Sequence, residues 1–409
     1  MNILFLTYSY PPAVGGVERV VSALAAHLVA RGHRALVVTH APVRFFAYEP
    51  GAVPVLRIRI PSQCQPDAAG RWYAAKRNTF NLLVMAAFAL RFRADALSSH
   101  FINMDTLYAR RIACLLRIPH AVTVHGSDVL SWGRQDPLRE RYVADALAAA
   151  DRVTAVARTV LDDAAHYDSA HRDATRSDSA HYDSAHYDSA HHDTTHHDAT
   201  HAAPPRGVVI PNPVDIAALE ALAGPRDAAA TPYVLCAGRL SPEKRFETAI
   251  DALHALAAGG SALELRIAGE GPCAADLRAR AAAGPAAARI RFLGPTTPAE
   301  TARQMRSAAA LVLSSEREGC PNVLLEAMAL GTPILAADIP AVRELIEPGV
   351  TGTLFAGGDP AELANALHAL IGAPERFRAM TAAARLRAQV AHAPATIADM
   401  YLALFARQP

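Results

Sequence analysis

Short apolar runs alternate with segments of helical period in two successive series along the chain. The first series begins at the run 3–7, continues with a helical pattern over 17–31, and reaches a run at 153–157. The second series begins at 233–237 and includes a late run at 334–336. Such alternation indicates βαβ units and parallel sheets. We therefore predict an α/β protein with two Rossmann-like doubly wound domains facing across a cleft that would hold a ligand.

The length of 409 residues also favours two or three domains, since one domain usually takes about 100–200 residues. The join is predicted just after 208–213, because the stretch that follows, 217–232, is rich in Ala, Gly and Pro. We expect domains at 1–213 and 214–390. Residues 391–409 would form a C-terminal helix that packs back on the first domain.

One segment breaks the alternation, and we assign 166–205 to a low-complexity pentapeptide insertion. Between His166 and His201 the chain repeats His-Tyr-Asp-Ser-Ala with variants, and the tract holds nine of the 18 histidines beside seven aspartates. A five-residue period matches neither a helix nor a strand, so the tract offers no continuous apolar face and is predicted to be disordered. Metal binding is the alternative, although residues five apart on a helix point in different directions.

Charge and hydropathy narrow the class of protein. Residues 1–100 hold eleven Lys or Arg against four Asp or Glu, so the first domain is basic. The longest nearly uncharged apolar run, Phe80 to Leu90, falls short of the roughly 20 residues that span a bilayer. The N-terminus lacks the pattern of a secretory signal, so we expect a cytoplasmic protein. Lys76 and Lys244 are the only lysines, which disfavours Schiff-base chemistry such as that of pyridoxal phosphate enzymes.

Two carboxylates, Glu318 and Glu326, flank the predicted start of a helix. The apolar run 310–314 has the pattern of a buried strand, Pro321 suits the first turn of a helix, and Gly331 would close that helix. In open α/β sheets ligands bind outside the carboxyl ends of strands, where helix N-termini offer N–H groups to anions. The stretch therefore predicts a site for a phosphate-bearing, polyhydroxylated ligand.

Other polar residues follow predicted strands in the same way. Arg239 and Lys244 could neutralise a diphosphate, or they could belong to a solvated basic loop. The Gly15-Gly16 pair would let the backbone approach a phosphate, or it could be a plain turn. His125 ends an apolar strand, where a catalytic and a structural role are equally open.

Taken together, these residues resemble a GT-B glycosyltransferase of family 4, the retaining group with the E-x7-E motif. The resemblance is carried by Glu318 and Glu326 with seven residues between them, by Gly238-Arg239-Leu240 with Lys244, and by the Gly15-Gly16 loop. It covers nearly the whole chain apart from the repeat tract. Two departures stand out: Arg245 replaces a usual glycine, and Cys320-Pro321-Asn322 replaces the commoner Phe-Gly pairing.

The resemblance implies transfer of a sugar from a nucleoside diphosphate sugar with retention at the anomeric carbon. It assigns Arg239 and Lys244 to the leaving diphosphate and Glu318 to the donor sugar, with His125 close to that sugar. Glu326 would accept hydrogen bonds from the ribose. The rest of the donor site would come from the backbone at Gly15, Gly16, Asn322, Val323 and Leu324. The resemblance implies neither a metal nor another cofactor.

The expected partners are the nucleotide-sugar donor and a glycan or a polyprenyl- or lipid-linked acceptor in bacterial surface polysaccharide, lipopolysaccharide or glycolipid synthesis. No nucleic acid is expected. Basic and aromatic residues at 71–77 and 91–93 predict peripheral contact with anionic lipid at the inner face of the cytoplasmic membrane. The alternatives are another GT-B activity, such as a nucleotide-sugar epimerase or a phosphorylase, and a non-catalytic protein that binds nucleotide sugar or metal.

Overall fold

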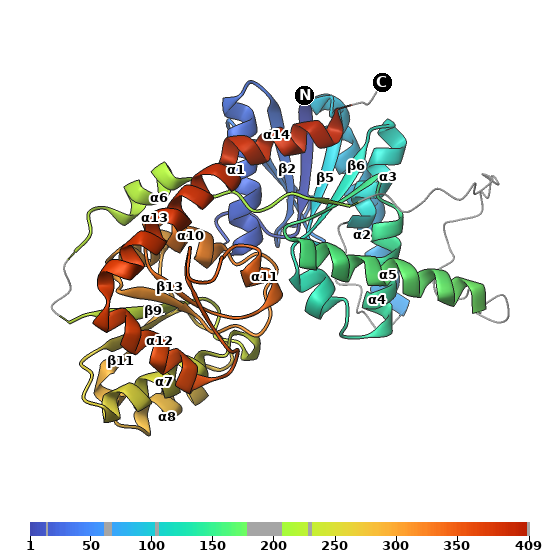
Figure 1. Cartoon of the computed structure of the whole chain (residues 1–409). Helices are drawn as coiled ribbons and strands as arrows, with labels where there is room; N and C mark the ends of the chain where they lie inside the picture. The colour runs from blue at the N-terminus through green and yellow to red at the C-terminus, as the bar shows by residue number, and fades with distance from the viewer. Residues whose placement is uncertain (14, 61–67, 103–105, 178–206, 228–230, 407–409) are drawn as a thin grey trace. The chain divides into compact units, whose positions relative to one another are not determined.

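The computed structural model describes residues 1–13, 15–60, 68–102, 106–177, 207–227 and 231–406. They form two compact units, unit 1 (Met1–Ile210 with Leu402–Pro409) and unit 2 (Pro211–Tyr401). Each unit has its own sheet flanked by helices, with strands that pair mainly in parallel (Figure 1). The predicted α/β class with two doubly wound domains is confirmed.

The sheet of unit 1 has the order β3-β4-β2-β1-β5-β6-β7-β8. Its strands are β1 (Asn2–Thr7), β2 (Arg34–His40), β3 (Phe46–Glu49), β4 (Val55–Ile58), β5 (Ala96–His100), β6 (His120–Val124), β7 (Arg152–Ala155) and β8 (Val208–Val209). The described strands pair in parallel, except that β3 runs antiparallel to β4 at the edge. Since β1 pairs with both β2 and β5, the chain reverses its direction of winding between β1 and β5.

Helices of unit 1 cover this sheet and close its core. They are α1 (Gly16–Ala30), α2 (Ala68–Phe92), α3 (Thr106–Leu116), the π-helix η1 (Asp128–Trp132), α4 (Pro137–Ala148) and α5 (Arg158–Ser177). Met85 and Ala89 of α2 pack with Ile112 of α3 against the apolar side chains of β1, β2, β4 and β5. None of the helices within the described residues is long and apolar enough to cross a membrane.

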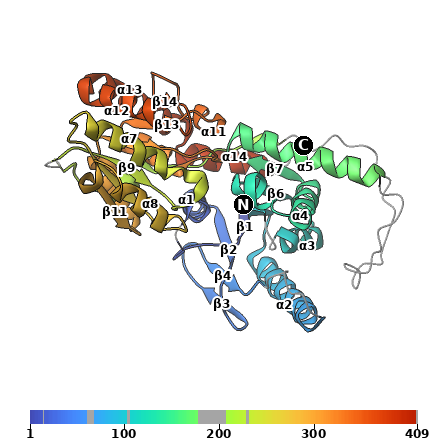
Figure 2. The same ribbon diagram turned by 90° about the horizontal axis from the view of Figure 1, so that it is seen from below.

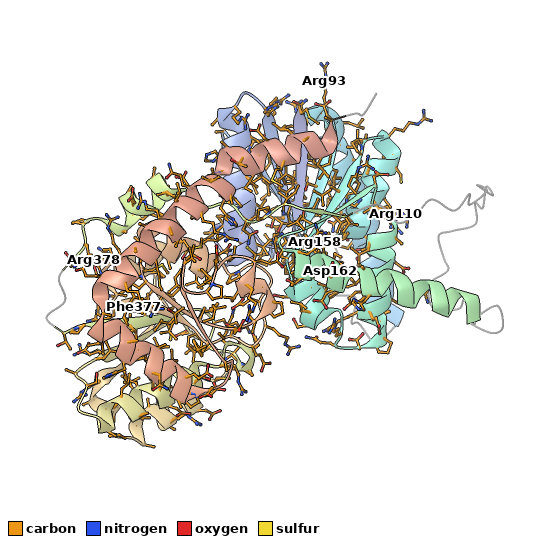
Figure 3. The ribbon with its side chains drawn as sticks, in the orientation of Figure 1. Arg93, Arg110, Arg158, Asp162, Phe377 and Arg378 are labelled. Carbon is orange, nitrogen blue, oxygen red and sulfur yellow. The ribbon has the colours of Figure 1, made fainter. Side chains whose placement is uncertain are left out.

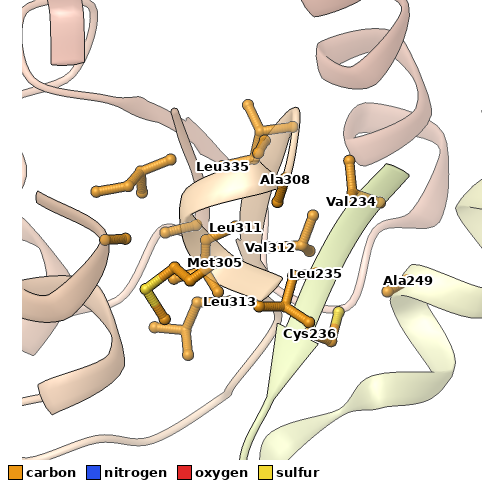
Figure 4. Close-up of a cluster of buried hydrophobic side chains, with 14 of the residues drawn as sticks. Val234, Leu235, Cys236, Ala249, Met305, Ala308, Leu311, Val312, Leu313 and Leu335 are labelled. Atoms are coloured by element: carbon orange, nitrogen blue, oxygen red, sulfur yellow. The ribbon is translucent and has the colours of Figure 1, made fainter. Parts of the chain in front are cut away.

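The sheet of unit 2 has the order β11-β10-β9-β12-β13-β14, and its strands pair in parallel. The strands are β9 (Tyr233–Ala237), β10 (Glu264–Ala268), β11 (Ile290–Gly294), β12 (Ala310–Leu313), β13 (Ile334–Ala337) and β14 (Thr353–Phe355). Figure 4 shows the core at its centre, where Leu235 of β9 and Leu311 of β12 lie near Met305. Continuous burial of these strands explains why they read as unbroken apolar runs.

The helices of unit 2 form two layers. One layer contains α7 (Phe246–Ala258), α8 (Ala274–Ala282) and α12 (Pro360–Gly372), and the other contains α6 (Ile216–Ala223), α9 (Pro298–Ser307), α10 (Asn322–Leu330) and α13 (Pro374–Ala391). Shorter helices are η3 (Pro242–Lys244), η4 (Ala287–Arg289) and α11 (Pro340–Arg343). The final helix, α14 (Pro394–Phe405), begins in unit 2, and its residues from Leu402 onward group with unit 1.

The repeat tract departs in part from the prediction of disorder. Helix α5 begins at Arg158, with Asp162 one turn on (Figure 3), and it runs to Ser177 through the first repeat units. Burial of Val160, Ala164 and Tyr167 along one face anchors the helix start. A helix anchored in this way extends at little cost through residues that lack an apolar face of their own. The rest of the tract, 178–206, lies outside the described residues.

Candidate functional site

The candidate site of unit 2 lies at the carboxyl ends of β9 and β12. These neighbouring strands are the point where the strand order reverses, since the chain proceeds from β9 to β10 and β11 on one side and from β12 to β13 and β14 on the other. Loops leaving such a pair diverge to opposite faces and open a crevice in which ligands bind. The two loops here are 238–245 and 314–321, which contain the predicted Arg239, Lys244 and Glu318.

Lys244 and Glu318 form an ion pair across this point. The Lys244 Nζ lies 2.6 Å from Glu318 Oε1, with the side chains 25% and 10% exposed. The Ser315 hydroxyl donates to the same carboxylate oxygen at 2.7 Å, and the Ser314 hydroxyl donates to the Lys244 carbonyl at 2.8 Å. These contacts fix the position of the Lys244 ammonium group. The sequence placed both residues in one site, and the structure shows that they touch.

Arg239 adds a second cation near this pair. Its side chain is exposed at the end of β9. Burial opposes ionisation of the nearby Glu243, but a hydrogen bond from Ser241 and the charges of Lys244 and Arg239 outweigh it and lower the pKa of that carboxyl. The Glu243 carbonyl also accepts a hydrogen bond from the backbone N–H of Glu316 at 2.9 Å, which joins the two loops a second time.

A neighbouring glycine loop fixes the β9 loop, and sequence reasoning missed it. Gly269 has a φ of 138°, and a Cβ there would clash with the carbonyl oxygen of Gly238. A Cβ at Gly271 would clash in the same way with the carbonyl oxygen of Leu240. The Leu240 N–H donates to the Glu270 carbonyl at 2.9 Å. The available signal was Gly-Glu-Gly directly after an apolar strand, a pattern that marks close approach of two backbones.

Arg245 stands in the left-handed region, which explains why glycine is usual at this position in the resembling family. Its φ and ψ are 49° and 40°, and it connects η3 to α7. A residue with a Cβ is strained in this conformation. The guanidinium lies 3.3 Å from Glu247 and 3.9 Å from Glu316, so the added cation is shared between carboxylates on the loop surface.

Helix α10 begins at Asn322, one residue after the predicted start, because Pro321 is the N-cap residue, and it is closed as predicted by Gly331 in the left-handed region at φ 67°. The helix has no side-chain cap at its N-terminus, and the Leu324 N–H donates to the Pro321 carbonyl at 2.9 Å. Leu324 is fully buried, so its side chain is not available to a ligand. Val323 and Glu326 are partly buried, and Glu326 lies one turn into the helix.

Asn212 anchors this helix start, a role that the sequence did not reveal. Its side-chain amide is buried and donates to Asn322 Oδ1 at 2.9 Å and to the Cys320 carbonyl at 3.3 Å. Its carbonyl is joined to the His392 Nδ1 at 2.9 Å, and the Val214 N–H donates to the His392 carbonyl at 2.8 Å. The segment that enters unit 2 is therefore tied both to α10 and to the end of α13.

In unit 1, His125 lies at the end of β6 and contacts a second histidine, His100, at the end of the neighbouring β5. The His100 Nδ1 and His125 Nε2 are 3.2 Å apart, and the Ser98 hydroxyl lies 3.2 Å from His100 Nε2. Burial lowers the pKa of His125 to about 3 and holds the pKa of His100 well below its usual value, so both rings are neutral. His100 was missed because it closes a short strand that reads as core.

Asp128 fixes the turn that carries His125. This fully buried carboxylate accepts backbone hydrogen bonds from Gly126 at 2.8 Å, from His125 at 3.1 Å, and from Ile102 and Val129 at 3.2 Å each. Burial raises its pKa in spite of these donors. Satisfied in this way, the group holds the loops after β5 and β6 in one arrangement.

Gly15 and Gly16 stand at the start of α1, as predicted. Gly15 is the N-cap residue in an extended conformation, and the Glu18 carboxylate lies directly over it. A carboxylate is stable at a helix N-terminus because the partial positive charge there favours an anion. The start of α1, which the sequence assigned to a phosphate, therefore already holds the negatively charged Glu18 carboxylate.

Among the described residues, no group of three or more His, Cys, Asp or Glu side chains is placed to hold a metal ion. Most histidines of the repeat tract fall in 178–206, outside that part of the chain.

Several solved structures share this architecture. The Anabaena HepE protein in complex with UDP and glucose superposes with a TM-score of 0.71 at 20% identity, covering 99% of both chains. The lipopolysaccharide outer core galactosyltransferase WaaB gives a TM-score of 0.66 at 16% identity, covering 100% of both chains. At these identities the likeness shows the fold.

Curated relatives match parts of the chain more closely. The phosphatidyl-myo-inositol mannosyltransferase of Mycobacterium leprae is 38% identical over 171 residues, which is 40% of this chain and 44% of the relative. An amylovoran biosynthesis glycosyltransferase of Erwinia amylovora is 33% identical over 146 residues, 34% of this chain and 36% of the relative. The matched stretches thus span less than half the length of these relatives.

Two family models match the two units in turn. The model described as Glycosyltransferase Family 4 matches residues 14–175, and the model described as Glycosyl transferases group 1 matches residues 231–373. The first match lies in unit 1 and includes Gly15, Gly16 and His125, while the second lies in unit 2 and includes Lys244 and Glu318. Because both units match models of this family and the solved structures share the fold, the chain belongs to the family 4, or group 1, glycosyltransferases of the GT-B fold.

Proposed function

We propose that the protein transfers a sugar from a nucleoside diphosphate sugar to an acceptor hydroxyl with retention of configuration at the anomeric carbon. The observation that carries this proposal is the Lys244–Glu318 pair at 2.6 Å, held at the strand-order reversal of unit 2. Arg239 lies on the same loop, and the N-terminus of α10 follows the loop that bears Glu318.

The chemistry requires cations at the leaving group. As the bond from C1 to the diphosphate oxygen breaks, negative charge grows on the diphosphate and positive charge grows on the sugar ring. Preorganised charges that meet the growing charge lower the barrier, and removing one such donor typically costs a factor of about 10²–10³. Lys244 and Arg239 take this role, and the first-turn N–H groups of α10 add partial positive charge.

The remaining roles follow the family pattern and are supported by position. An ammonium has three N–H donors, so Lys244 can bind a phosphate oxygen and keep Glu318 beside the donor sugar. Glu326, one turn into α10, would accept from the ribose hydroxyls. His125, Gly15 and Gly16 would serve the same donor from unit 1. No metal or other cofactor takes part in the proposed reaction.

The proposed acceptor is a glycan or a polyprenyl- or lipid-linked sugar, used in bacterial surface polysaccharide, lipopolysaccharide or glycolipid synthesis at the cytoplasmic face of the inner membrane. Support comes from two matched relatives, whose names mention phosphatidyl-myo-inositol and amylovoran biosynthesis. The excess of basic residues in 1–100 favours a negatively charged environment such as this membrane face. The proposal involves no nucleic acid.

A donor screen tests the proposal. Thermal unfolding of the full chain is followed with UDP-, GDP- and ADP-sugars, since a ligand of the folded state raises its apparent stability. The stabilising donor is then titrated by calorimetry against the wild type, Glu326→Gln and the exposed control Glu375→Gln. We expect Glu326→Gln to weaken binding by at least about 1 kcal/mol and the control to bind normally. Equal binding by all three would remove the ribose role from Glu326.

The reaction type is read from the products. Incubation with the donor and candidate acceptors should release the nucleoside diphosphate only when an acceptor is present, and proton NMR should show the donor's anomeric configuration in the product. An inverted product would contradict retention. Conversion of the donor to an isomer without any acceptor would instead favour an epimerase.

A further inference from the structure

A polar cavity lies in unit 2 at the end of the sheet opposite to the proposed donor site. Tyr233 and Glu264 are the first residues of β9 and β10, and Arg291 lies at the start of β11, the edge strand (Figure 2). These three residues line the cavity together with Arg266 of β10 and Gln304 of α9. Its volume of about 620 Å³ falls in the range of about 300–1,000 Å³ that is typical of small-molecule sites. It is called the amino-end cavity below.

Charged residues occupy strand positions here that are usually apolar. Glu264 and Arg266 alternate along β10 and so face the same side of the sheet, and Arg266 is paired in register with Arg291. Strands of parallel sheets are covered on both faces and are normally rich in Val, Ile and Leu. Replacing a buried ion pair by apolar residues is often neutral or stabilising. The stability of the sheet therefore does not explain the presence of Glu264, which is 8% exposed, and Arg266 at these positions.

Neighbouring side chains fix the orientation of Arg266. Its guanidinium carbon lies 3.6 Å from the centroid of the Tyr233 ring, and its Nη1 donates to Gln304 Oε1 at 2.9 Å. The Tyr233 hydroxyl donates to the Gln304 carbonyl at 2.7 Å. Arg291 Nη2 donates to Glu264 Oε1 at 3.0 Å, and Arg266 Nη2 lies 3.5 Å from Glu264 Oε2. The two arginines therefore share one carboxylate, and the three side chains together carry one unit of positive charge.

Two polar atoms of this cluster lack a hydrogen-bond partner among the described residues. Arg266 Nε and Glu264 Oε2 are both buried, and neither makes a hydrogen bond. Buried polar atoms are normally paired. The side chains that carry these atoms line the cavity and are 20% and 11% exposed. The cluster thus has an unused donor beside an unused acceptor, which a molecule with an acceptor and a donor close together would satisfy.

The other charges at the rim of the cavity do not cancel the positive charge of the cluster. Glu300 accepts a hydrogen bond from the Thr297 N–H at 2.8 Å at the N-terminus of α9, where the partial positive charge of the helix offsets its own. Asp227 and Arg303 are exposed and opposite in charge. The Arg291 side chain is 59% exposed. A ligand that enters the cavity therefore meets a positively charged guanidinium group.

We propose that the amino-end cavity binds a small oxyanion that also carries a hydroxyl group. The phosphate or carboxylate of such a ligand accepts hydrogen bonds from Arg266 and Arg291, because a planar guanidinium matches either group. The ligand hydroxyl donates to Glu264 Oε2. The inference goes beyond the proposed function, since none of these residues belongs to the proposed donor site.

Calorimetric titration of the full chain with glycerol 3-phosphate and with glycerate tests the proposal. The tighter of the two shows whether the site prefers phosphate or carboxylate. Inorganic phosphate and acetate, which lack an alcohol group, and glycerol, which lacks a charge, are the comparison probes. We expect the better hydroxylated anion to bind at least about five-fold tighter than its simple counterpart, because it gains a hydrogen bond to a charged group. Failure of both hydroxylated anions to bind overturns the proposal.

Substitutions locate the bound anion. Arg291→Gln should weaken its binding at least about ten-fold through loss of a charge-assisted hydrogen bond. The matched control is Arg278→Gln, an exposed arginine that lies over the ring of Phe292 on the other face of β11 and should bind as the wild type does. Normal binding by Arg291→Gln, or an equal loss in Arg278→Gln, overturns the proposal.

Glu264→Gln tests the hydroxyl contact. The variant should bind the simple anion more tightly, because a negative charge has been removed, and should lose most of the preference for the hydroxylated anion. A purely structural role of Glu264 would not change this preference. An unchanged preference in Glu264→Gln therefore contradicts the proposal.

Lys244→Met separates this cavity from the proposed donor site. The variant should bind the anion normally, while its reaction with the donor is impaired. Loss of anion binding in Lys244→Met would place the anion in the donor site and overturn this inference alone. Wild-type protein that binds the anion but no nucleotide sugar would reject the proposed function alone. Thermal melting of each variant shows whether the fold is retained.

Discussion

In both units polar side chains lie where the strand order reverses, but they are charged in unit 2 and neutral in unit 1. In unit 2 the strands at the reversal, β9 and β12, lead to a partly exposed ion pair between Lys244 and Glu318. In unit 1 the corresponding strands are β1 and β5, and β5 ends at His100, which contacts His125 in a neutral, buried pair. The site of unit 2 therefore has charged side chains, whereas burial keeps the two imidazole rings of unit 1 neutral.

The difference shows what a sheet edge does and does not determine. Topology determines where loops diverge, while the side chains at the strand ends determine the chemistry. A lysine that keeps its counterion suits the stabilisation of charge on a leaving group. Neutral imidazoles suit hydrogen bonding to hydroxyl groups, since each ring offers one donor and one acceptor.

Removing the charge of unit 2 should have the largest effect. Lys244→Met keeps the length of the side chain but removes a cation that we propose for the leaving diphosphate. We expect kcat/KM for the donor to fall by a factor of about 10³. Arg303→Met removes an exposed cation from α9 and should leave the rate within a factor of about two. A normal rate for Lys244→Met would contradict the catalytic role of Lys244, because the ion pair would then be only structural.

Lowering the pH should destabilise unit 1, because burial lowers the pKa of its buried histidines. Burial lowers the pKa of His120 to about 4 and that of His125 to about 3, whereas the unfolded chain binds these protons near about 6.5. Unfolding then takes up protons below that value, so stability falls as the pH drops from about 6.5 towards about 4. His120 alone should cost about 2 kcal/mol at a pH of about 5.

Urea unfolding across this pH range measures the effect. His120→Gln should flatten the pH dependence, while His368→Gln, at an exposed position on α12, should not change it. An unchanged slope in the His120 variant would show that its ring is not held neutral by the fold.

Loosening the anchor of α10 should have a moderate effect that is confined to the donor. Asn212→Ala removes the hydrogen bonds to Asn322 and Cys320, so the first turn of α10 loses its fixed position. We expect the donor KM to rise about five- to ten-fold, equivalent to about 1 kcal/mol, with a smaller change in kcat. Asn81→Ala is an equally buried control in unit 1 and should leave the donor KM unchanged. Equal effects of both variants would indicate general destabilisation.

Relieving strain at Arg245 should have the smallest effect and the opposite sign. Arg245→Gly suits the φ of 49° and loses only exposed ion pairs, which contribute little. We expect the free energy of unfolding to rise by about 0.5–1 kcal/mol in urea titrations. Arg93→Gly, at a φ of 55° in unit 1, should behave in the same way. A loss of stability in the first variant alone would give Arg245 a role beyond the turn.

The elements of unit 2 could be read from the sequence where single residues have fixed backbone preferences. Pro321 and Gly331 bound α10 because proline suits a helix start and glycine tolerates the left-handed C-cap at φ 67°. Arg239, Lys244 and Glu318 could be assigned to one end of the sheet because they follow apolar strands. The alternation of these strands with helices was enough to place the three residues at that end of the sheet.

The contacts themselves could not be read in this way. Lys244 and Glu318 are 74 residues apart, and they meet because β9 pairs with β12, an order that the pattern does not encode. Asp128 and His100 are completely buried polar residues, and a periodicity argument treats such residues as exceptions. Helix α5 extends into the repeat because its anchor lies upstream, outside the tract whose period was considered.

The Lys244–Glu318 pair has a consequence for the choice among ligands. Because the ammonium is already matched by the Glu318 carboxylate, a bare phosphate gains little by entering the crevice, since the charge that attracts it is partly neutralised. A complete donor, in the proposed arrangement, brings a diphosphate for Lys244 and sugar hydroxyls for Glu318 at the same time. We therefore expect the pair to favour the complete donor over its fragments, so product inhibition should be weak.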